Sequence, residues 1–308
     1  MPPLYFIRER VMGKKKNKKV GGQTLIAKSI SKYFPVFVLP TFVAFCIGFI
    51  WPFIQGMYLS FCSFTIPKDA EFIGFGNYVK AFADPGFKHA FVYTAAFAVV
   101  SIVAINLLAF TVAYFLTQNI KGANIFRTVF FMPNLICGIV LGYIWSMIFD
   151  AILMRYDTFL LAKTEYGFWG LVILMCWQQV GYMMIIYIAG IQNIPDYLHE
   201  AAAIDGASPL QSLFHITVPM VMPSVTICTF LTLTNAFKLF DQNLALNGKA
   251  AETSLLALDI YKTFYDHTGL KLAQWHGIGQ AKAVIFFILV AVIAFIQLRA
   301  TKQKEIEQ

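Results

Sequence analysis

Two long apolar runs of this chain carry side chains that can hydrogen-bond or stack against a flat ring. The six candidates for a binding site are Trp177, Gln178 and Tyr182 in the run at about 167–190, and Asn235, Lys238 and Asp241 in the run at about 219–243. Polar groups at membrane depth are costly, so they usually face the interior of a helix bundle or a water-filled cavity. Gln178 and Tyr182 are four residues apart and share a helical face, and Lys238 and Asp241, three apart, could form an ion pair. The spacing predicts a polar, hydrated site between two helices.

Several of these candidates also have a structural interpretation. Lys238 lies near the end of its apolar run, where its stem can extend so that the ammonium group reaches the outer interface. Trp177 and Tyr182 could instead pack between helices. These alternatives stay open at the level of the sequence.

The sequence offers no comparable arrangement for catalysis or metal binding. No group of His, Asp, Glu and Cys with catalytic spacing falls within the apolar runs, and the five cysteines are scattered without a Cys-x-x-Cys pair. We therefore predict neither an embedded enzyme nor a metal site.

The composition places these residues in a membrane. Of 308 residues, 58% are hydrophobic and 13% are charged, whereas an ordinary soluble domain carries about 25% charged residues. A span needs about 20 mostly apolar residues, and lipid-exposed spans must be helical to satisfy their backbone. We therefore predict an all-α, polytopic membrane protein with six transmembrane helices. The expected spans are about 34–61, 88–117, 125–149, 167–190, 219–243 and 280–298.

The positive charges predict the orientation of the chain. Lysines and arginines crowd the segment 1–33, and Arg299, Lys302 and Lys304 follow the last span. Because cytoplasmic segments carry an excess of these residues, we expect both termini, a basic tail at 1–33 and a shorter one at 299–308, to be cytoplasmic. The net charge of +8 comes mostly from the first tail, which favours contact with anionic lipid. Nucleic-acid binding is not indicated.

The connection at 191–219, between the fourth and fifth spans, is also expected to be cytoplasmic. Its first half is suited to a short helix, because Asp196 and Glu200 place negative charge near the positive end of the helix dipole. Ala201 and Ala202 are strong helix formers with little bulk. Gly206 then supplies a position after the helix where a left-handed backbone costs little.

The second half of this connection carries the start signals of another helix. Ser208 is suited to the N-cap, Pro209 to the first helical position and Gln211 to the third, as in a capping box. Pro219 and Pro223 are expected to end the hairpin and open the next span. These residues predict two short helices that form a stiff knob, although an ordinary helix–turn–helix connection between two spans would follow the same local rules.

The spacing of this segment resembles a known family. Glu200-Ala201-Ala202, Gly206, Ile216 and Val218-Pro219 are similar to the EAA loop in the permease subunits of bacterial ABC importers, with Val218 where the family usually has Leu. The rest of the chain, from about Phe34 to Leu298, resembles the carbohydrate class, which includes maltose, lactose and glycerol-3-phosphate permeases. The supporting segments are IGFGNYVKAFADPGF (Ile73–Phe87), IFRTVFFMPNLI (Ile125–Ile136) and IAGIQNIPDYLHEAAAIDGAS (Ile188–Ser208).

The resemblance implies an ABC importer type I permease fold in a bacterial inner membrane and an import function for a sugar or oligosaccharide. It implies a second permease subunit, two ATP-binding subunits and an extracellular solute-binding protein as partners, with ATP and Mg²⁺ held by the ATPase subunits and no cofactor on this chain. It also implies that the EAA loop is a coupling helix that docks on the ATPase. The residues that carry this role over are Glu200, Ala201, Ala202, Asp205 and Gly206.

Two further observations bear on this interpretation. The chain has no G-x-x-x-x-G-K-[ST] phosphate loop, so any ATP hydrolysis is expected on a separate subunit. The alternative is a self-sufficient secondary carrier of a small polar solute. Such carriers usually have internal repeats and paired carboxylates, whereas Asp241 is nearly alone within the spans.

Overall fold

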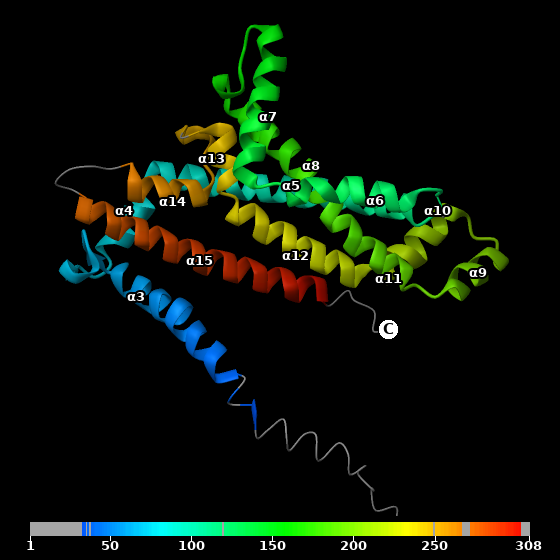
Figure 1. Ribbon diagram of the computed structural model, residues 1–308, viewed down its shortest axis with the longest axis horizontal. Coiled ribbons are helices and arrows are strands. Elements are labelled where there is room, and N and C mark those ends of the chain that lie inside the picture. Colours follow the sequence, from blue (N-terminus) through cyan, green and yellow to red (C-terminus); the bar gives the residue numbers. More distant parts are fainter. Residues whose placement is uncertain are drawn as a thin grey trace, which may run out of the picture. The chain divides into compact units, whose positions relative to one another are not determined.

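The computed structural model describes residues 33, 34, 36, 38–118, 120–248, 250–266 and 272–302. The chain divides into two units, residues 1–56 and 57–308, and each is described by itself (Figure 1). The described part of the first unit is an apolar helix that belongs to the candidate span Val38–Leu59. It contains a π-helical turn, η1 (Cys46–Ile50), and continues as α3 (Trp51–Leu59). Pro52 has no backbone N–H to donate, and the change of hydrogen-bond pattern in the preceding turn accommodates it.

The second unit begins with a small antiparallel ribbon. Strand β1 (Cys62–Ser63) pairs with β2 (Glu71–Phe72), with Cys62 opposite Phe72. The 3₁₀ turn η2 (Pro67–Asp69) connects the strands, and helix α4 (Gly76–Ala83) follows them. The buried Asn77 side chain donates hydrogen bonds to the carbonyls of Ser60 (3.0 Å) and Cys62 (2.8 Å), which ties α4 to the ribbon.

Long helices form the rest of this unit. They and the elements between them are α5 (Pro85–Leu116), α6 (Ala123–Phe131), η3 (Met132–Leu135), α7 (Gly138–Leu153), η4 (Met154–Tyr156), η5 (Leu160–Ala162), α8 (Thr164–Gln192), α9 (Asp196–Ile204), α10 (Pro209–Ser212), η6 (Leu213–Thr217), α11 (Val218–Met220), α12 (Met222–Lys238), α13 (Asp241–Asn247), η7 (Ala251–Thr253), α14 (Leu256–Tyr265) and α15 (Leu272–Lys302).

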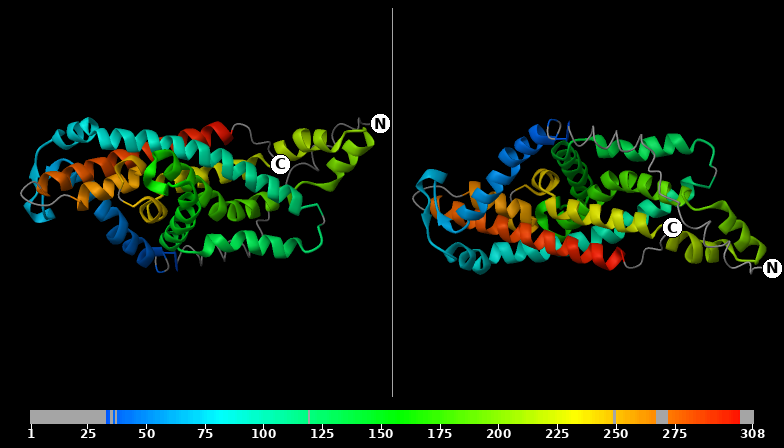
Figure 2. Two further views of the ribbon diagram at one scale, coloured as in Figure 1. Left: turned by 90° about the horizontal axis from the view of Figure 1, so that it is seen from above. Right: turned by 90° about the horizontal axis from the view of Figure 1, so that it is seen from below.

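Helix α8 lies at the centre of the packing. Its most apolar window is 61% buried, the highest fraction among the candidate spans of the described residues. Helix α5 packs along α8, and α12 packs against both α5 and α15 (Figure 2). Gly181 allows the closest approach in this core, because a Cβ at that position would clash with the backbone carbonyl of Phe130. Because the backbone of α6 lies directly against Gly181 of α8, no larger residue fits there.

The predicted all-α, multi-span architecture is confirmed, with two differences in detail. Within the described residues, five helices are long and apolar enough to span a membrane, and a sixth crossing is a pair bent by 66°, Pro209–Met220 with Met222–Lys238. The run at 125–149 is divided into α6 and α7 by the turn around Pro133. Prolines cause both interruptions because they cannot donate to the helical ladder. The orientation of the termini stays a prediction, and residues 1–32 of the basic tail lie outside the described residues.

Candidate coupling hairpin and polar pocket

The first helix of the hairpin, α9, ends in a Schellman motif. The N–H of Ala207 donates to the carbonyl of Ala202 (2.9 Å), and the N–H of Gly206 donates to the carbonyl of Ala203 (3.1 Å). Gly206 has φ +79°, in the left-handed region that its missing Cβ makes accessible. The predicted turn is therefore present, and the alanines supply the carbonyl groups that close it.

The second helix begins with the capping box that Ser208 and Gln211 predict. The Gln211 N–H donates to Ser208 Oγ (3.3 Å), and the Ser208 N–H donates to Gln211 Oε1 (2.7 Å). The break that ends the hairpin lies between Pro219 and Pro223: helical backbone continues through η6 and α11 to Met220, and α12 then begins at Met222 with Pro223 in its first turn. The π-turn η6 shifts the hydrogen-bond pattern before Pro219, so the helix passes the proline and breaks only at Val221.

One side-chain contact joins the two helices of the hairpin. His199 Nδ1 lies 2.9 Å from Ser212 Oγ, and the two residues come from α9 and α10. The hairpin is apolar around its turn: Ile204, just before the turn, is 86% exposed, and Leu210 and Phe214, which follow the turn in the chain, are also exposed. Glu200 is also exposed. Sequence reasoning identified the small and charged residues here and missed these exposed apolar side chains, although an isoleucine beside a predicted turn was a usable signal.

The polar residues of the two apolar runs meet where α8, α12 and α13 converge. Gln242 Nε2 donates to Gln178 Oε1 (2.9 Å), and Gln178 Nε2 donates to the carbonyl of Ile136 (3.3 Å). Asn235 Nδ2 donates to Gln179 Oε1 (3.2 Å). These bonds satisfy amide groups that would otherwise be costly to bury.

A pocket of about 230 Å³ opens beside these amides. Its lining residues are Met175, Gln179, Asn235, Lys238, Leu239, Phe240, Asp241 and Gln242. Three of the six predicted pathway residues thus line one pocket, and Gln178 reaches it through Gln242. Trp177 and Tyr182 are not among its lining residues. Trp177 packs edge-on against Trp145, with ring centres 5.6 Å apart.

The expected ion pair between Lys238 and Asp241 is not formed among the residues that the structure describes. Helix α12 ends at Lys238, and the extended residue Leu239 precedes the new helix that begins at Asp241. The helical spacing on which the pairing was based is therefore interrupted. Both side chains are exposed, and both line the pocket as separate charges.

A buried ion cluster was missed by sequence reasoning. Lys282 of α15 is 1% exposed, and its ammonium group donates to Asp84 Oδ2 (2.6 Å), Asp259 Oδ2 (2.8 Å) and Thr263 Oγ1 (2.8 Å). Burial alone would raise the pKa of the Asp84 carboxyl, but the hydrogen bond and charge of Lys282, with the N–H groups of Gly86 and Phe87, hold it below its usual value. A lysine inside an apolar helix was the available signal.

The bundle and the hairpin together define a class of protein: a multi-pass membrane subunit with an exposed, stiff helical knob between two spans. A family model supports this assignment. Residues 105–304 match the binding-protein-dependent transport system inner membrane component. The chain belongs to this family, and the match gives no support to the alternative of a self-sufficient carrier.

Sequence alignments with two transport permeases extend the similarity to most of the chain. The chain is 41% identical over 282 residues to the probable starch degradation products transport system permease protein AmyD of Thermoanaerobacterium thermosulfurigenes, which covers 88% of this chain and 94% of the relative. It is 27% identical to the multiple sugar-binding transport system permease protein MsmF of Streptococcus mutans, over 91% of this chain and 99% of the relative.

A solved structure shares the fold. It is a bacterial ABC transporter involved in the import of the acidic polysaccharide alginate, and one of its chains matches with a TM-score of 0.76 at 19% identity. The match covers 90% of this chain and 98% of that chain.

Proposed function

We propose that this chain is the permease subunit of an ATP-driven importer that moves an oligosaccharide delivered by an external binding protein. The observation that carries the proposal is the hairpin at 196–220, because its turn is fixed by a Schellman motif and a capping box while the apolar side chains beside the turn stay exposed. A stiff, exposed element between two spans can transmit a force from a partner into the bundle.

The partner at the hairpin is a separate ATPase. Glu200, Ala201, Ala202, Asp205 and Gly206 form the docking helix and its turn, and the exposed Ile204 provides the apolar anchor of the contact. Small alanine side chains allow the partner's backbone to approach closely. ATP and Mg²⁺ belong to the two ATPase subunits, and a second permease subunit completes the pathway.

The pocket beside Asn235 is the part of the pathway that this chain contributes. Its amides can both donate and accept hydrogen bonds, and Lys238 and Asp241 add one charge of each sign. Such a set matches the hydroxyl groups of a neutral sugar, while Phe240 and Leu239 offer apolar surface to the C–H groups of a ring. The named function of the 41% identical relative supports a product of starch degradation as the substrate.

Reconstitution in liposomes tests this function. The chain, its second permease, the ATPase and the binding protein are incorporated together, and uptake of labelled maltotriose is measured with and without internal ATP. We expect uptake only with the complete set and ATP. The chain alone, tested under proton and sodium gradients, is the control, and uptake there would reject the proposal.

A further inference from the structure

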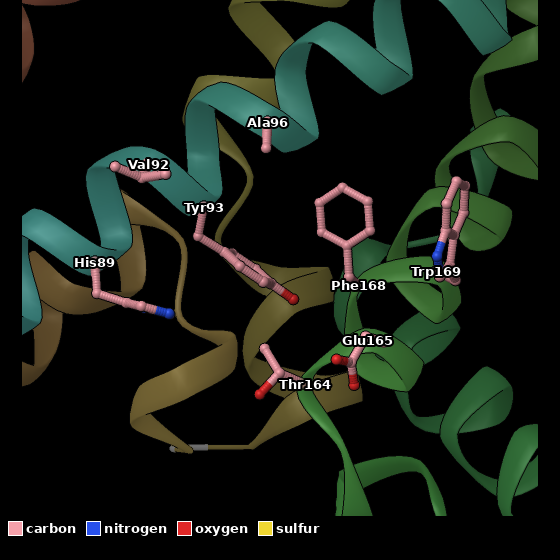
Figure 3. A pocket seen from close by; sticks show the side chains of 8 residues that line it. All are labelled: His89, Val92, Tyr93, Ala96, Thr164, Glu165, Phe168 and Trp169. Carbon is pink, nitrogen blue, oxygen red and sulfur yellow. The ribbon is translucent and has the colours of Figure 1, made fainter.

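A second cavity lies between α5 and the start of α8, away from the pocket beside Asn235. It has a volume of about 340 Å³, within the range of roughly 300–1,000 Å³ that small-molecule sites occupy. Its lining residues are His89, Val92, Tyr93 and Ala96 of α5, and Thr164, Glu165, Phe168 and Trp169 of α8 (Figure 3). On the predicted topology this is the outer end of both helices.

The Tyr93 hydroxyl is a polar group beside this cavity whose hydrogen-bonding capacity is unused. Tyr93 is only 9% exposed, and its oxygen has no hydrogen-bond partner among the residues that the structure describes. Figure 3 shows the hydroxyl directed toward the side of the cavity that Thr164 and Glu165 line. A buried hydroxyl without a partner is costly, so a ligand that bonds to it would be stabilised.

The remaining lining combines flat rings with a carboxylate. The rings of Tyr93 and Phe168 meet edge to face with centres 5.5 Å apart, and Trp169, 54% exposed, lies edge to face with Phe168 at 5.6 Å. Glu165 is exposed and ready to accept hydrogen bonds. Thr164 is already engaged, because its hydroxyl donates to Glu252 Oε2 (2.9 Å).

Helix α8 connects this cavity with the pocket beside Asn235. Phe168 and Gln179 are eleven residues apart, which is close to three full turns, so they lie on one face of the helix about 16 Å apart. Val172 and Met175 lie between them on this face and are buried, so an extended ligand has to pass around these side chains to meet both sites.

The geometry points to an outer sugar subsite, in which one ring of an oligosaccharide lies against the aromatic side chains while its hydroxyl groups bond to Tyr93 and Glu165. This inference rests on the proposed function. The class of ligand follows from the pairing of ring surfaces with a hydroxyl and a carboxylate. A lipid acyl chain would leave both polar groups without partners, and a cation would leave the Tyr93 O–H donor without an acceptor.

Two conservative variants test the subsite in the complete reconstituted importer. Tyr93→Phe removes one hydrogen bond and Glu165→Gln weakens another by removing the charge of its acceptor, and the matched controls are Tyr143→Phe on the exposed surface of α7 and Glu71→Gln in β2. Uptake is measured for maltose and for a series of longer maltooligosaccharides. We expect each variant to raise KM about two- to tenfold for the long oligomers, with maltose and both controls unchanged.

Occupancy is measured separately by protection of a cysteine. Ala96 lines the cavity and is exposed, so Ala96→Cys is labelled with a maleimide from outside, with the unmodified chain as the background for the native cysteines. Long oligosaccharides should slow the labelling, and Glu165→Gln should reduce that protection at the same sugar concentration. Tetramethylammonium, the probe for a cation site, should have no effect.

The outcomes separate this inference from the proposed function. If the wild-type importer transports oligosaccharides but both variants match their controls, or if Tyr93→Phe only raises the thermal stability, the subsite is wrong and the function stands. Equal effects on maltose and long oligomers, or protection by tetramethylammonium instead of sugar, would also overturn the subsite. If the wild-type importer transports no sugar, the proposed function itself fails.

Discussion

Lys282 on the last helix is joined to Asp84, the N-cap of α5, by a 2.6 Å ion pair across 198 residues of sequence. The Asp84 side chain also accepts a hydrogen bond from the Gly86 N–H (2.9 Å), so one carboxylate both starts α5 and neutralises the lysine. Asp259 brings α14 to the same ammonium group. All three donors of Lys282 are therefore used, and the cluster fixes three helices at one end of the bundle.

Replacement of Lys282 by methionine should destabilise this end of the bundle. The change leaves two carboxylates facing each other without a cation, and breaking a buried pair in this way costs about 3–5 kcal/mol. We expect the lower end of that range, because Asp84 is 30% exposed and can be solvated. Thermal unfolding in detergent measures the loss. Addition of Asp84→Asn and Asp259→Asn to Lys282→Met should recover part of it, and a triple variant no more stable than Lys282→Met would contradict the account.

The same cluster predicts a dependence on pH. The pKa of Asp84 is lowered in the folded protein, so its contribution is present at neutral pH and is lost as the pH falls through that depressed pKa, below about 4. Thermal unfolding measured between pH 7 and pH 3 should show a drop in Tm at the acid end. The drop should be smaller in Asp84→Asn, and an identical pH profile in that variant would argue against the cluster as the cause.

Gly206→Val should uncouple transport from ATP hydrolysis. The φ of +79° at this position disfavours any residue with a Cβ, by roughly 1–2 kcal/mol, and a β-branched one most of all. Gly206→Asn is the matched control, because asparagine tolerates the left-handed region better. Sugar-stimulated ATPase activity of the complete importer is the measurement. Full stimulation in the valine variant would show that the turn does not need to be rigid.

Ile204→Ser should weaken ATPase docking without unfolding the hairpin. Ile204 is 86% exposed in this chain, so its removal leaves no cavity here, whereas an anchor residue in an interface is worth about 2 kcal/mol or more. Co-purification of the ATPase with the permease would report the loss, with Ile66→Ser as the control for an exposed isoleucine elsewhere. Equal recovery of ATPase from both variants would show that Ile204 is not part of the docking contact.

Gln178→Ala should raise KM for the sugar by several-fold while assembly stays intact. The Gln178 side chain accepts a 2.9 Å hydrogen bond from Gln242, which lines the pocket. Removal of the Gln178 amide therefore frees Gln242 to move away from its position in the pocket wall. Asn235→Ala should have a similar effect, because it lines the pocket directly. Uptake kinetics distinguish the two contributions from a general loss of protein, which would lower the maximal rate. Normal kinetics in both variants would place the pathway elsewhere.

Local chemistry made the hairpin predictable from the sequence. The roles of Gly206, Ser208 and Gln211 depend on bonds between residues at most five positions apart, so spacing alone determined the turn and the cap. The apolar composition likewise determined the membrane-spanning helical class, because the bilayer leaves few alternatives for a backbone.

Only the tertiary structure decided which distant residues meet. The ion cluster joins Asp84, Asp259 and Lys282, and the second cavity joins Tyr93 with Glu165. Neither grouping has a sequence spacing that could reveal it, since helices far apart in the chain bring the side chains together. The structure also separated Lys238 from Asp241, because a helix ends between them. Spacing predicts contacts within one continuous helix, whereas contacts between helices, and those across a helix break, depend on how the whole bundle packs.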